Sequence, residues 1–167
     1  MIRLEKFTKS DYDRLIQWTT NEKVTFVFSG GIFDYPITHE QLDEYSSVKN
    51  RIVYRVIELE TNTVIGHAEF NDFNKKNRSS RICRVLIGDE ANRGKGYGTL
   101  LMKELIRIGF EELKLHRIDL GVHEFNKRAI RCYQKCGFEI EGLLRDSMKY
   151  QNKYWSAYNM SILNNNQ

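Results

Sequence analysis

The sequence predicts an α/β protein with a central mixed, mostly antiparallel, seven-stranded sheet that is flanked by about four helices. Apolar residues alternate in short segments typical of strands, and they recur at helical spacing in longer ones. The predicted order is strand, two helices, three strands, helix, strand, helix and two strands. The 167 residues, 41% of them hydrophobic, suffice for one substantial core and are few for two. We therefore expect residues 1–167 to form a single domain.

The N-terminal part is expected to contain one strand and two helices. Residues 2–7 form the strand, and Ser10 is the expected N-cap of an amphipathic helix. Residues 24–36 are rich in aromatic side chains around two adjacent glycines, which predicts an irregular loop. Thr38 has capping-box spacing to the glutamine three residues later, so a second helix is expected to run from there to about Lys49.

The rest of the chain supplies most of the sheet. Helical spacing is clear between residues 100 and 113 and over residues 126–136, and Gly137 follows the second helix in a C-cap position. The polar tail over residues 164–167 is expected to fray. The remaining strands are expected over residues 52–59, 64–73, 81–88, 115–122, 138–148 and 154–163.

Composition and charge narrow the possible functions. Lysine and arginine (26) exceed aspartate and glutamate (22), giving a net charge of +4, which fits an anionic small ligand better than a nucleic-acid surface. No segment has the ~20 apolar residues of a membrane span, and the charged N-terminal residues do not resemble a signal peptide. Three cysteines do not make a disulfide framework. These three observations together predict a cytoplasmic location. Cys132 and Cys136 lack the further ligands of a structural zinc site, so we expect them to have packing roles and the protein to bind no metal.

A glycine-rich loop joins the fourth strand to the third helix. Gly94, Gly96 and Gly98 allow the backbone to approach a ligand closely, and the following helix offers free N–H groups and a positive dipole end. Arg93 and Lys95 add positive charge, so the loop can hold an anion. A flexible glycine turn explains the glycines alone equally well. No lysine–hydroxyl pair of a Walker loop ends the segment, and the order of elements is not that of a dinucleotide-binding fold.

The loop, written Arg93-x-x-Gly96-x-Gly98, resembles the acetyl-CoA pyrophosphate loop of the GNAT superfamily of N-acetyltransferases, in the place where that family has it. The resemblance implies a GNAT-like layered fold. It also implies that Arg93, Gly94, Gly96, Gly98 and Thr99 hold the pyrophosphate through backbone amides. In this family the strand before the loop splays from its neighbour and pairs its main chain with the pantetheine amides; here those residues are Val85, Leu86 and Ile87.

A second segment resembles the same family. Asn126, Ala129, Tyr133, Gly137 and Phe138 match the pattern Asn-x-x-Ala-x-x-x-Tyr-x-x-x-Gly-Phe. The resemblance implies that Asn126 contacts the pantetheine arm, although a plain N-cap is an equally good physical use of this residue. It implies that Tyr133 is the general acid that protonates the departing thiolate; the alternative is an ordinary core tyrosine.

The general base is less well defined. Many family members use a carboxylate on a central strand, but the fourth strand of this chain carries none before the loop. Glu69 on the third strand is the main candidate, and His123 and Glu124 after the fifth are alternatives. A structural role is also open for each of them.

The close resemblance covers residues 85–138, about a third of the chain. Residues 141–146 and the pair Tyr154-Trp155 resemble the branch that acetylates ribosomal-protein N-termini (RimJ/RimL-like) and, in relatives, polyamines or other small amines. Some aromatic residues are expected to line the acceptor cleft and others to lie in the core: Trp18, Phe26, Phe28, Phe33, Tyr35, Tyr154 and Trp155.

The predicted function is transfer of an acetyl group from acetyl-CoA to a primary amine, by direct attack in a ternary complex. The acceptor is a protein N-terminus or a small amine, and homodimerisation is possible, as the family often pairs through its last strands. We expect neither nucleic acid nor membrane as a partner. The alternatives are a non-catalytic acyl-CoA-binding sensor of the same fold and a nucleotide- or RNA-binding module that uses the same loop.

Overall fold

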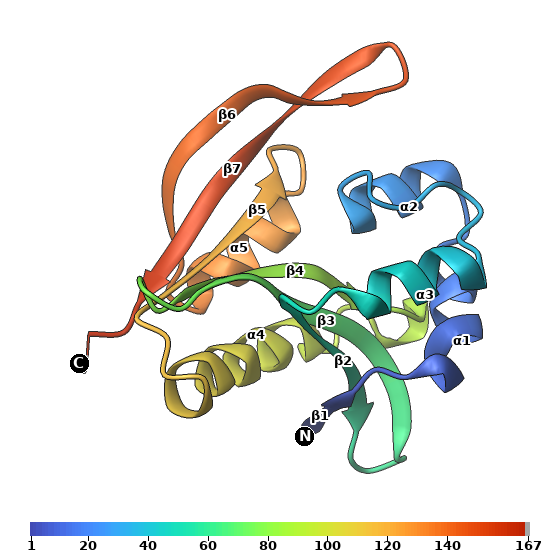
Figure 1. The fold of residues 1–167 in the computed structure, drawn as a ribbon, viewed down its shortest axis with the longest axis horizontal. Coiled ribbons are helices and arrows are strands. Elements are labelled where there is room, and N and C mark those ends of the chain that lie inside the picture. Colours follow the sequence, from blue (N-terminus) through green and yellow to red (C-terminus); the bar gives the residue numbers. More distant parts are fainter. Residues whose placement is uncertain (166–167) are drawn as a thin grey trace. The chain divides into compact units, whose positions relative to one another are not determined.

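The computed structural model describes residues 1–165, which form a seven-stranded sheet and five α-helices (Figure 1). The order of strands across the sheet is β1-β2-β3-β4-β5-β7-β6. β4 and β5 are parallel, whereas β1–β2, β5–β7 and β6–β7 are antiparallel pairs. The predicted fold class is therefore confirmed, with one helix more than expected.

The strands are β1 (Ile2–Lys6), β2 (Arg51–Glu58), β3 (Thr63–Asn74), β4 (Ser79–Ile87), β5 (Arg117–His123), β6 (Glu139–Tyr150) and β7 (Lys153–Leu163). The helices are α1 (Tyr12–Trp18), α2 (Glu22–Ser29), α3 (His39–Ser47), α4 (Tyr97–Arg107) and α5 (Lys127–Lys135). Short 3-10 turns cover Lys9–Asp11 and Glu90–Asn92, and a π-helical turn, Ile108–Glu112, continues α4.

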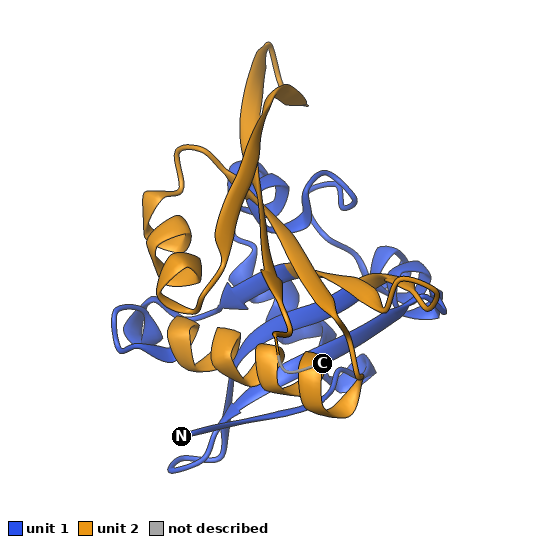
Figure 2. Ribbon diagram, turned by 90° about the vertical axis from the view of Figure 1, so that its left-hand side faces the viewer, with its two compact units in different colours: residues 1–70, 84–97 blue, residues 71–83, 98–167 orange. Residues whose placement is uncertain are grey.

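The chain divides into two compact units (Figure 2). The first contains residues 1–70 and 84–97, and the second contains residues 71–83 and the chain from residue 98 onward. The expected single domain over residues 1–167 stays a prediction. Within residues 1–165, no helix is both long and apolar enough to cross a membrane.

The first unit has a core rich in aromatic side chains. Helices α1, α2 and α3 and the segments beside them contribute its buried residues: Phe7, Tyr12, Leu15, Trp18, Phe28, Phe33, Ile37, Leu42 and Tyr45. Three of the aromatic residues that sequence left open between core and cleft, Trp18, Phe28 and Phe33, therefore belong to this core. Burial of large aromatic side chains is a major stabilising contribution to such a unit.

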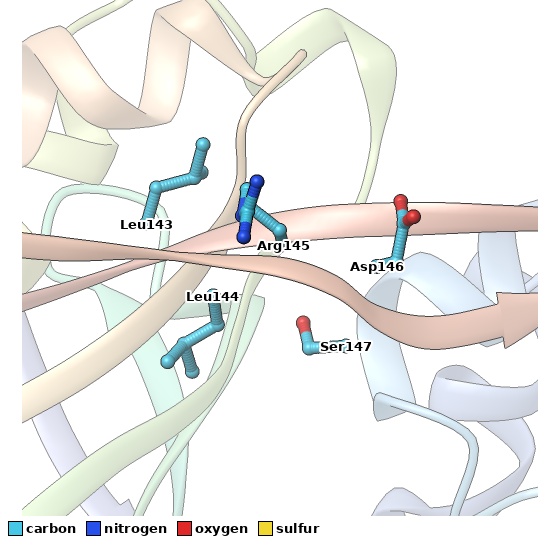
Figure 3. Close-up of a pocket in the computed structure, with 5 residues that line it drawn as sticks. All are labelled: Leu143, Leu144, Arg145, Asp146 and Ser147. Atoms are coloured by element: carbon cyan, nitrogen blue, oxygen red, sulfur yellow. The ribbon is translucent and has the colours of Figure 1, made fainter.

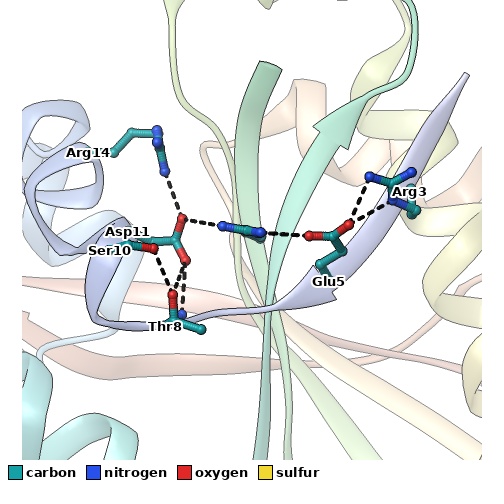
Figure 4. A network of polar contacts seen from close by, with 7 residues as sticks. Arg3, Glu5, Thr8, Ser10, Asp11 and Arg14 are labelled. Atoms are coloured by element: carbon teal, nitrogen blue, oxygen red, sulfur yellow. Dashed lines mark hydrogen bonds and ion pairs between the residues drawn. The ribbon is translucent and has the colours of Figure 1, made fainter. Parts of the chain in front are cut away.

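The junction between β1 and α1 is held by a buried carboxylate (Figure 4). Asp11 is 2% exposed, and its side chain accepts hydrogen bonds from the Thr8 N–H (2.9 Å) and from Arg14 (2.7 Å). Arg55 of β2 lies 3.4 Å from the same carboxylate and 2.7 Å from Glu5. Thr8 is thus the residue that opens the helical segment. The prediction that Ser10 is the N-cap was wrong, because the capping box is formed by Thr8, two residues earlier, with Asp11.

The prediction of a loop over residues 24–36 was wrong for the first part of this segment, which belongs to helix α2. The Asn21 side chain accepts a hydrogen bond from the Val24 N–H at 2.9 Å and caps the helix. Gly30 ends it in a left-handed conformation, with φ 64°. Aromatic and β-branched residues have modest helix propensity, but two good caps and the burial of Phe28 outweigh it.

The second unit is built around β5. Ile118, Leu120 and Val122 are buried, as their alternation predicted. Asn164 is also buried, and its N–H donates to the His116 carbonyl at 2.8 Å. The expected fraying of the tail is therefore wrong for this residue, and its last two residues lie outside the described part of the chain.

Candidate active site

The glycine loop has the backbone that its sequence predicted. It leaves β4, makes the 3-10 turn Glu90–Asn92 and enters α4 at Tyr97. Gly94 and Gly96 have φ values of 84° and 86°, in the left-handed region that disfavours other residues. Gly98 is different, because it has no such φ, and an added Cβ would lie 3.9 Å from the Cys132 sulfur, an ordinary contact. The loop itself therefore requires glycine at two of the three positions.

The Arg93 side chain closes this loop. Its Nη2 donates to the Gly88 carbonyl at 2.9 Å, and its Nε donates to the Ile87 carbonyl at 3.3 Å. The guanidinium thus ties the loop back to the end of β4. Gly88 is required for packing, since an added Cβ would lie 2.0 Å from the Trp18 indole. Sequence reasoning missed Gly88, because it precedes the motif and carries no periodic signal.

The end of β4 packs closely on β3 within the first unit. An added Cβ on Gly66 would lie 2.5 Å from the Leu86 carbonyl oxygen, so this glycine permits the close approach. The Gly88 N–H then donates to the Ile65 carbonyl at 2.9 Å. Val85, Leu86 and Ile87 are all partly buried. Their predicted main-chain contact with pantetheine stays a prediction.

In the second unit, the first turn of α4 contacts helix α5. The Thr99 hydroxyl lies 3.5 Å from the Cys132 sulfur, and the Cys136 thiol lies 3.9 Å from the Thr99 carbonyl. The two cysteines therefore have a packing role, as expected. Within residues 1–165, no three potential metal ligands of the His, Cys, Asp or Glu types are grouped.

Asn126 caps α5. Its side-chain oxygen accepts a hydrogen bond from the Ala129 N–H at 3.2 Å. The cap was one of the two uses that the sequence left open, and it occupies only the Oδ1 atom. The Nδ2 donor is the group available for a ligand. At the other end of the helix, Gly137 has φ 96°, as its predicted C-cap role requires.

Tyr133 lies in the last turn of α5, beside Phe138, with ring centroids 6.2 Å apart. Burial, with smaller contributions from the thiols of Cys132, Cys136 and Cys83, raises the pKa of its phenol. A raised pKa keeps the hydroxyl protonated over the whole physiological range. The side chain can therefore donate a hydrogen bond or a proton, as the acid role requires.

Glu69 is fully buried in the first unit. Its Oε1 accepts from Arg84 Nη1 at 2.5 Å, and its Oε2 accepts a short hydrogen bond from the Tyr45 hydroxyl. Burial raises the pKa of Glu69, against the opposing effect of Arg84, Tyr45 and Arg51. Its predicted role as general base stays a prediction. The alternative candidates, His123 and Glu124, belong to the second unit. The His123 ring stacks on Phe125 with 5.1 Å between ring centroids, and burial lowers the pKa of His123.

A shallow hollow lies on β6 (Figure 3). None of the predicted site residues lines it. It follows a register shift, because Leu144 pairs with Ala157 and Met148 pairs with Trp155. The Asp146 N–H in the shifted segment donates to the Ser156 hydroxyl at 3.0 Å. The hollow is lined by the shifted residues themselves: Leu143, Leu144, Arg145, Asp146 and Ser147.

Comparison with known proteins identifies the family. The acetyltransferase (GNAT) family pattern matches residues 11–138. An uncharacterized N-acetyltransferase of Bacillus licheniformis is 29% identical over 97% of this chain and 92% of its own. Spermidine N(1)-acetyltransferase of Vibrio cholerae is 29% identical over 75% of each chain.

The fold is likewise that of a solved acetyltransferase. The crystal structure of spermidine N-acetyltransferase from Vibrio cholerae in complex with CoA and spermine has a TM-score of 0.83 to this chain, with 23% identity. The likeness covers 97% of this chain and 95% of that one. Since the family pattern spans well over half of the sequence, the chain belongs to the acetyltransferase (GNAT) family and is an acetyl-CoA-dependent N-acetyltransferase.

Proposed function

We propose that the protein transfers the acetyl group of acetyl-CoA directly to a small primary amine, without a covalent enzyme intermediate. One observation carries this proposal. Two left-handed glycines lead into α4, and the first turn of α4 contacts the helix that bears Tyr133. The chain therefore runs directly from a loop suited to an anion into a helix whose first turn contacts α5.

The loop is proposed to hold the pyrophosphate of acetyl-CoA. The amides of Gly94, Gly96, Gly98 and Thr99 supply donors, and the positive end of the α4 dipole adds to them. The Arg93 side chain supports this loop by its bonds to the carbonyls of β4. Its contribution is therefore to the shape of the loop as well as to its charge.

The pantetheine arm is proposed to lie along Val85, Leu86 and Ile87, whose main chain pairs with its amides, and to receive a hydrogen bond from the Asn126 side-chain amide. The amine nitrogen attacks the thioester carbon, the carbon–sulfur bond breaks, and the leaving thiolate accepts a hydrogen bond or proton from Tyr133. The proton released by the attacking nitrogen passes to a base. Glu69 is one candidate base, and a different role for it is argued below.

The acceptor is proposed to be a small primary amine in preference to a protein N-terminus. The curated relative and the solved structure from Vibrio cholerae named above are both spermidine acetyltransferases. None of the three is named for ribosomal proteins, so the RimJ/RimL-like assignment has less support than the small-amine one. Spermidine and spermine are therefore the first acceptors to test.

The test follows release of free thiol from acetyl-CoA by the purified protein. The acceptor panel holds spermidine, spermine, single amino acids and short peptides with free N-termini. Release that depends on a polyamine or another small amine supports the proposal. Release with peptides alone would favour the N-terminal acetyltransferase branch. Binding of acetyl-CoA without release for any amine would instead favour the acyl-CoA sensor.

We also propose that the protein is a homodimer that pairs through β6. This strand is one of the two edges of the sheet, and its residues Ile140, Leu143 and Leu144 have exposed apolar side chains. Exposed apolar strand edges are normally covered by a partner. Sedimentation velocity tests this, with Leu144→Asp expected to give a monomer; a wild-type monomer would end the proposal. The cytoplasmic location stays a prediction, supported by three free thiols, which are typical of a reducing compartment.

A further inference from the structure

One residue inside β4 has an unusual backbone conformation. Arg84 has φ 50°, in the left-handed region, although it lies in the middle of the strand. The two other such strand residues within residues 1–165, Asp72 and Asp146, are aspartates, which tolerate this conformation better. An arginine there is strained, so the surrounding structure has to hold it.

Two residues of β3 hold Arg84 from both its main chain and its side chain. The Nδ1 of His67 lies 3.0 Å from the Arg84 carbonyl oxygen, and this carbonyl can only accept, so Nδ1 carries the proton. The Arg84 guanidinium donates to Glu69 at 2.5 Å. His67 and Glu69 are two residues apart on a strand, so they point to the same face and act on Arg84 together.

A second set of contacts fixes these two residues. The Tyr45 hydroxyl donates to Glu69 and lies 3.4 Å from His67 Nε2. The Arg51 guanidinium lies over the Tyr45 ring at 4.3 Å, and its Nε lies 3.5 Å from Glu69 Oε1. We call Tyr45, Arg51, His67 and Glu69 the Arg84 anchor.

The Arg84 anchor is closed to solvent. Its Glu69 and His67 are 0% and 1% exposed, and the Arg84 side chain is 7% exposed. Burial also lowers the pKa of His67 to about 4, which keeps the ring neutral and its Nδ1 proton directed at Arg84. Both oxygens of Glu69 accept from protein donors and the residue is 0% exposed, whereas a general base has to be reached by the substrate nitrogen.

We infer that His67 and Glu69 are positioning residues that hold Arg84 in its left-handed conformation and so set the course of the main chain through Val85, Leu86 and Ile87. A left-handed residue inside a strand redirects everything after it. The inference rests on the proposed function, because the course of these three residues matters only if they bind the pantetheine arm. It assigns Glu69 to the geometry of acetyl-CoA binding and removes it from proton transfer.

The first test compares Arg84→Gly with Arg84→Ala. Both remove the guanidinium, but glycine adopts a positive φ freely and alanine does not. If the left-handed conformation is what matters, Arg84→Gly binds acetyl-CoA within about threefold of wild type, whereas Arg84→Ala binds it about 5- to 30-fold more weakly. Isothermal titration calorimetry measures this without turnover. Equal affinities of the two variants would overturn the inference.

The second test uses Glu69→Gln alone and combined with Arg84→Gly. Alone, it should weaken acetyl-CoA binding by a similar 5- to 30-fold; in the Arg84→Gly background it should weaken binding less than twofold, because glycine needs no anchor. A general base would behave differently: Glu69→Gln would lower kcat about 100-fold or more, leave acetyl-CoA affinity unchanged and abolish the acid limb of the kcat/KM profile. That pattern would overturn the inference.

A matched control is Asp11→Asn, which removes another buried carboxylate paired with two arginines in the same unit. It should lower the melting temperature and leave acetyl-CoA affinity unchanged. If Glu69→Gln does not fold, the glycine–alanine comparison, which keeps Glu69, decides alone. Failure of the proposed function is separate, since wild type would then release no thiol from acetyl-CoA with any small amine, whatever the affinities of the variants. If wild type binds acetyl-CoA and every variant binds it equally well, only the inference fails.

Discussion

Replacing Tyr133 by phenylalanine removes one hydroxyl and tests the proposed acid. The ring and its contact with Phe138, at 6.2 Å between centroids, remain possible in the variant, so we expect little change in stability. The proposed step in which the hydroxyl acts is departure of the thiolate. We therefore expect kcat to fall while the dissociation constant of acetyl-CoA stays within about twofold of wild type.

The size of the fall follows from the pKa of the phenol. A free thiol has a pKa of about 8.5 and a free phenol about 10, so proton transfer from tyrosine to thiolate is already uphill. Burial raises the pKa of Tyr133 further and makes full transfer less favourable. Donation of a hydrogen bond to the charged sulfur is then the main contribution. Such bonds contribute about 1.5–3 kcal/mol, which corresponds to a loss of roughly 10- to 150-fold in kcat.

The assay is thiol release at saturating acetyl-CoA with the best amine from the acceptor panel, over pH 6–10. Tyr158→Phe is a suitable control, because Tyr158 is another partly buried tyrosine of the second unit that has no proposed role. Since the phenol stays protonated, the wild-type profile should show no alkaline loss from Tyr133 below pH 10. A Tyr133→Phe enzyme with wild-type kcat would refute the reasoning. A loss well beyond about 1,000-fold would show that full proton transfer, not hydrogen bonding, is the main contribution.

Three further outcomes are expected. Gly98→Ala should stabilise α4 by about 0.5–1 kcal/mol in thermal unfolding, because the added methyl group meets only an ordinary contact, yet it should raise the KM for acetyl-CoA if the backbone here approaches the pyrophosphate. Unchanged KM would show that this glycine is not needed for binding. Asp11→Asn should lower the unfolding free energy by about 2–3 kcal/mol in urea denaturation, since it leaves two arginines without their buried partner. A change under 0.5 kcal/mol would contradict this. Glu141 has a folded pKa of about 2, lowered first by its hydrogen bonds with Arg117, so its stabilising effect is present above the unfolded pKa of about 4.3 and is lost as pH falls towards 2. Because the side chain is 40% exposed, the difference from Glu141→Gln should be at most about 1 kcal/mol at pH 6 and should vanish near pH 2.

Features that depend on a few neighbouring residues could be predicted from sequence. Gly94 and Gly96 have the left-handed conformations that the loop motif requires, and Asn126 and Gly137 occupy the two ends of α5. Each of these depends on the local backbone alone, since a cap or a turn is complete within four or five residues. The same is true of Thr38, whose side chain accepts from the N–H three residues later.

Predictions failed where a local signal was read in the wrong place. The aromatic segment after Asn21 appeared irregular because its glycine pair suggested a loop, whereas Gly30 is the end of a helix. The N-cap signal at Asn21 was present in the sequence and was missed. Ser10 was predicted as the N-cap because it lies directly before the apolar periodicity, but the carboxylate of Asp11 reaches back to Thr8.

Other features could not be predicted, because they depend on residues far apart in the chain. Arg84 lies in a run that alternates like an ordinary strand, and its left-handed conformation depends on contacts from β2, β3 and α3. Gly66 and Gly88 are needed only because Leu86 and Trp18 pack against them. A glycine that permits tertiary packing and a glycine in a weak strand look the same in a single sequence.

Arg93 illustrates how the geometry of a side chain adds to what its charge indicates. In the sequence, an arginine at the start of a glycine loop indicates attraction for a phosphate. In the structure, two of its N–H groups donate hydrogen bonds to the carbonyl oxygens of Ile87 and Gly88, at the end of β4. The segment proposed to bind pantetheine, residues 85–87, lies between the two arginine contacts. Arg84 sets the backbone conformation where the segment begins, and Arg93 holds the backbone where it ends. In this chain, Arg84 and Arg93 therefore shape the proposed acetyl-CoA site at both ends of this segment, and the glycines between Arg93 and α4 are proposed to supply backbone amides for the contacts.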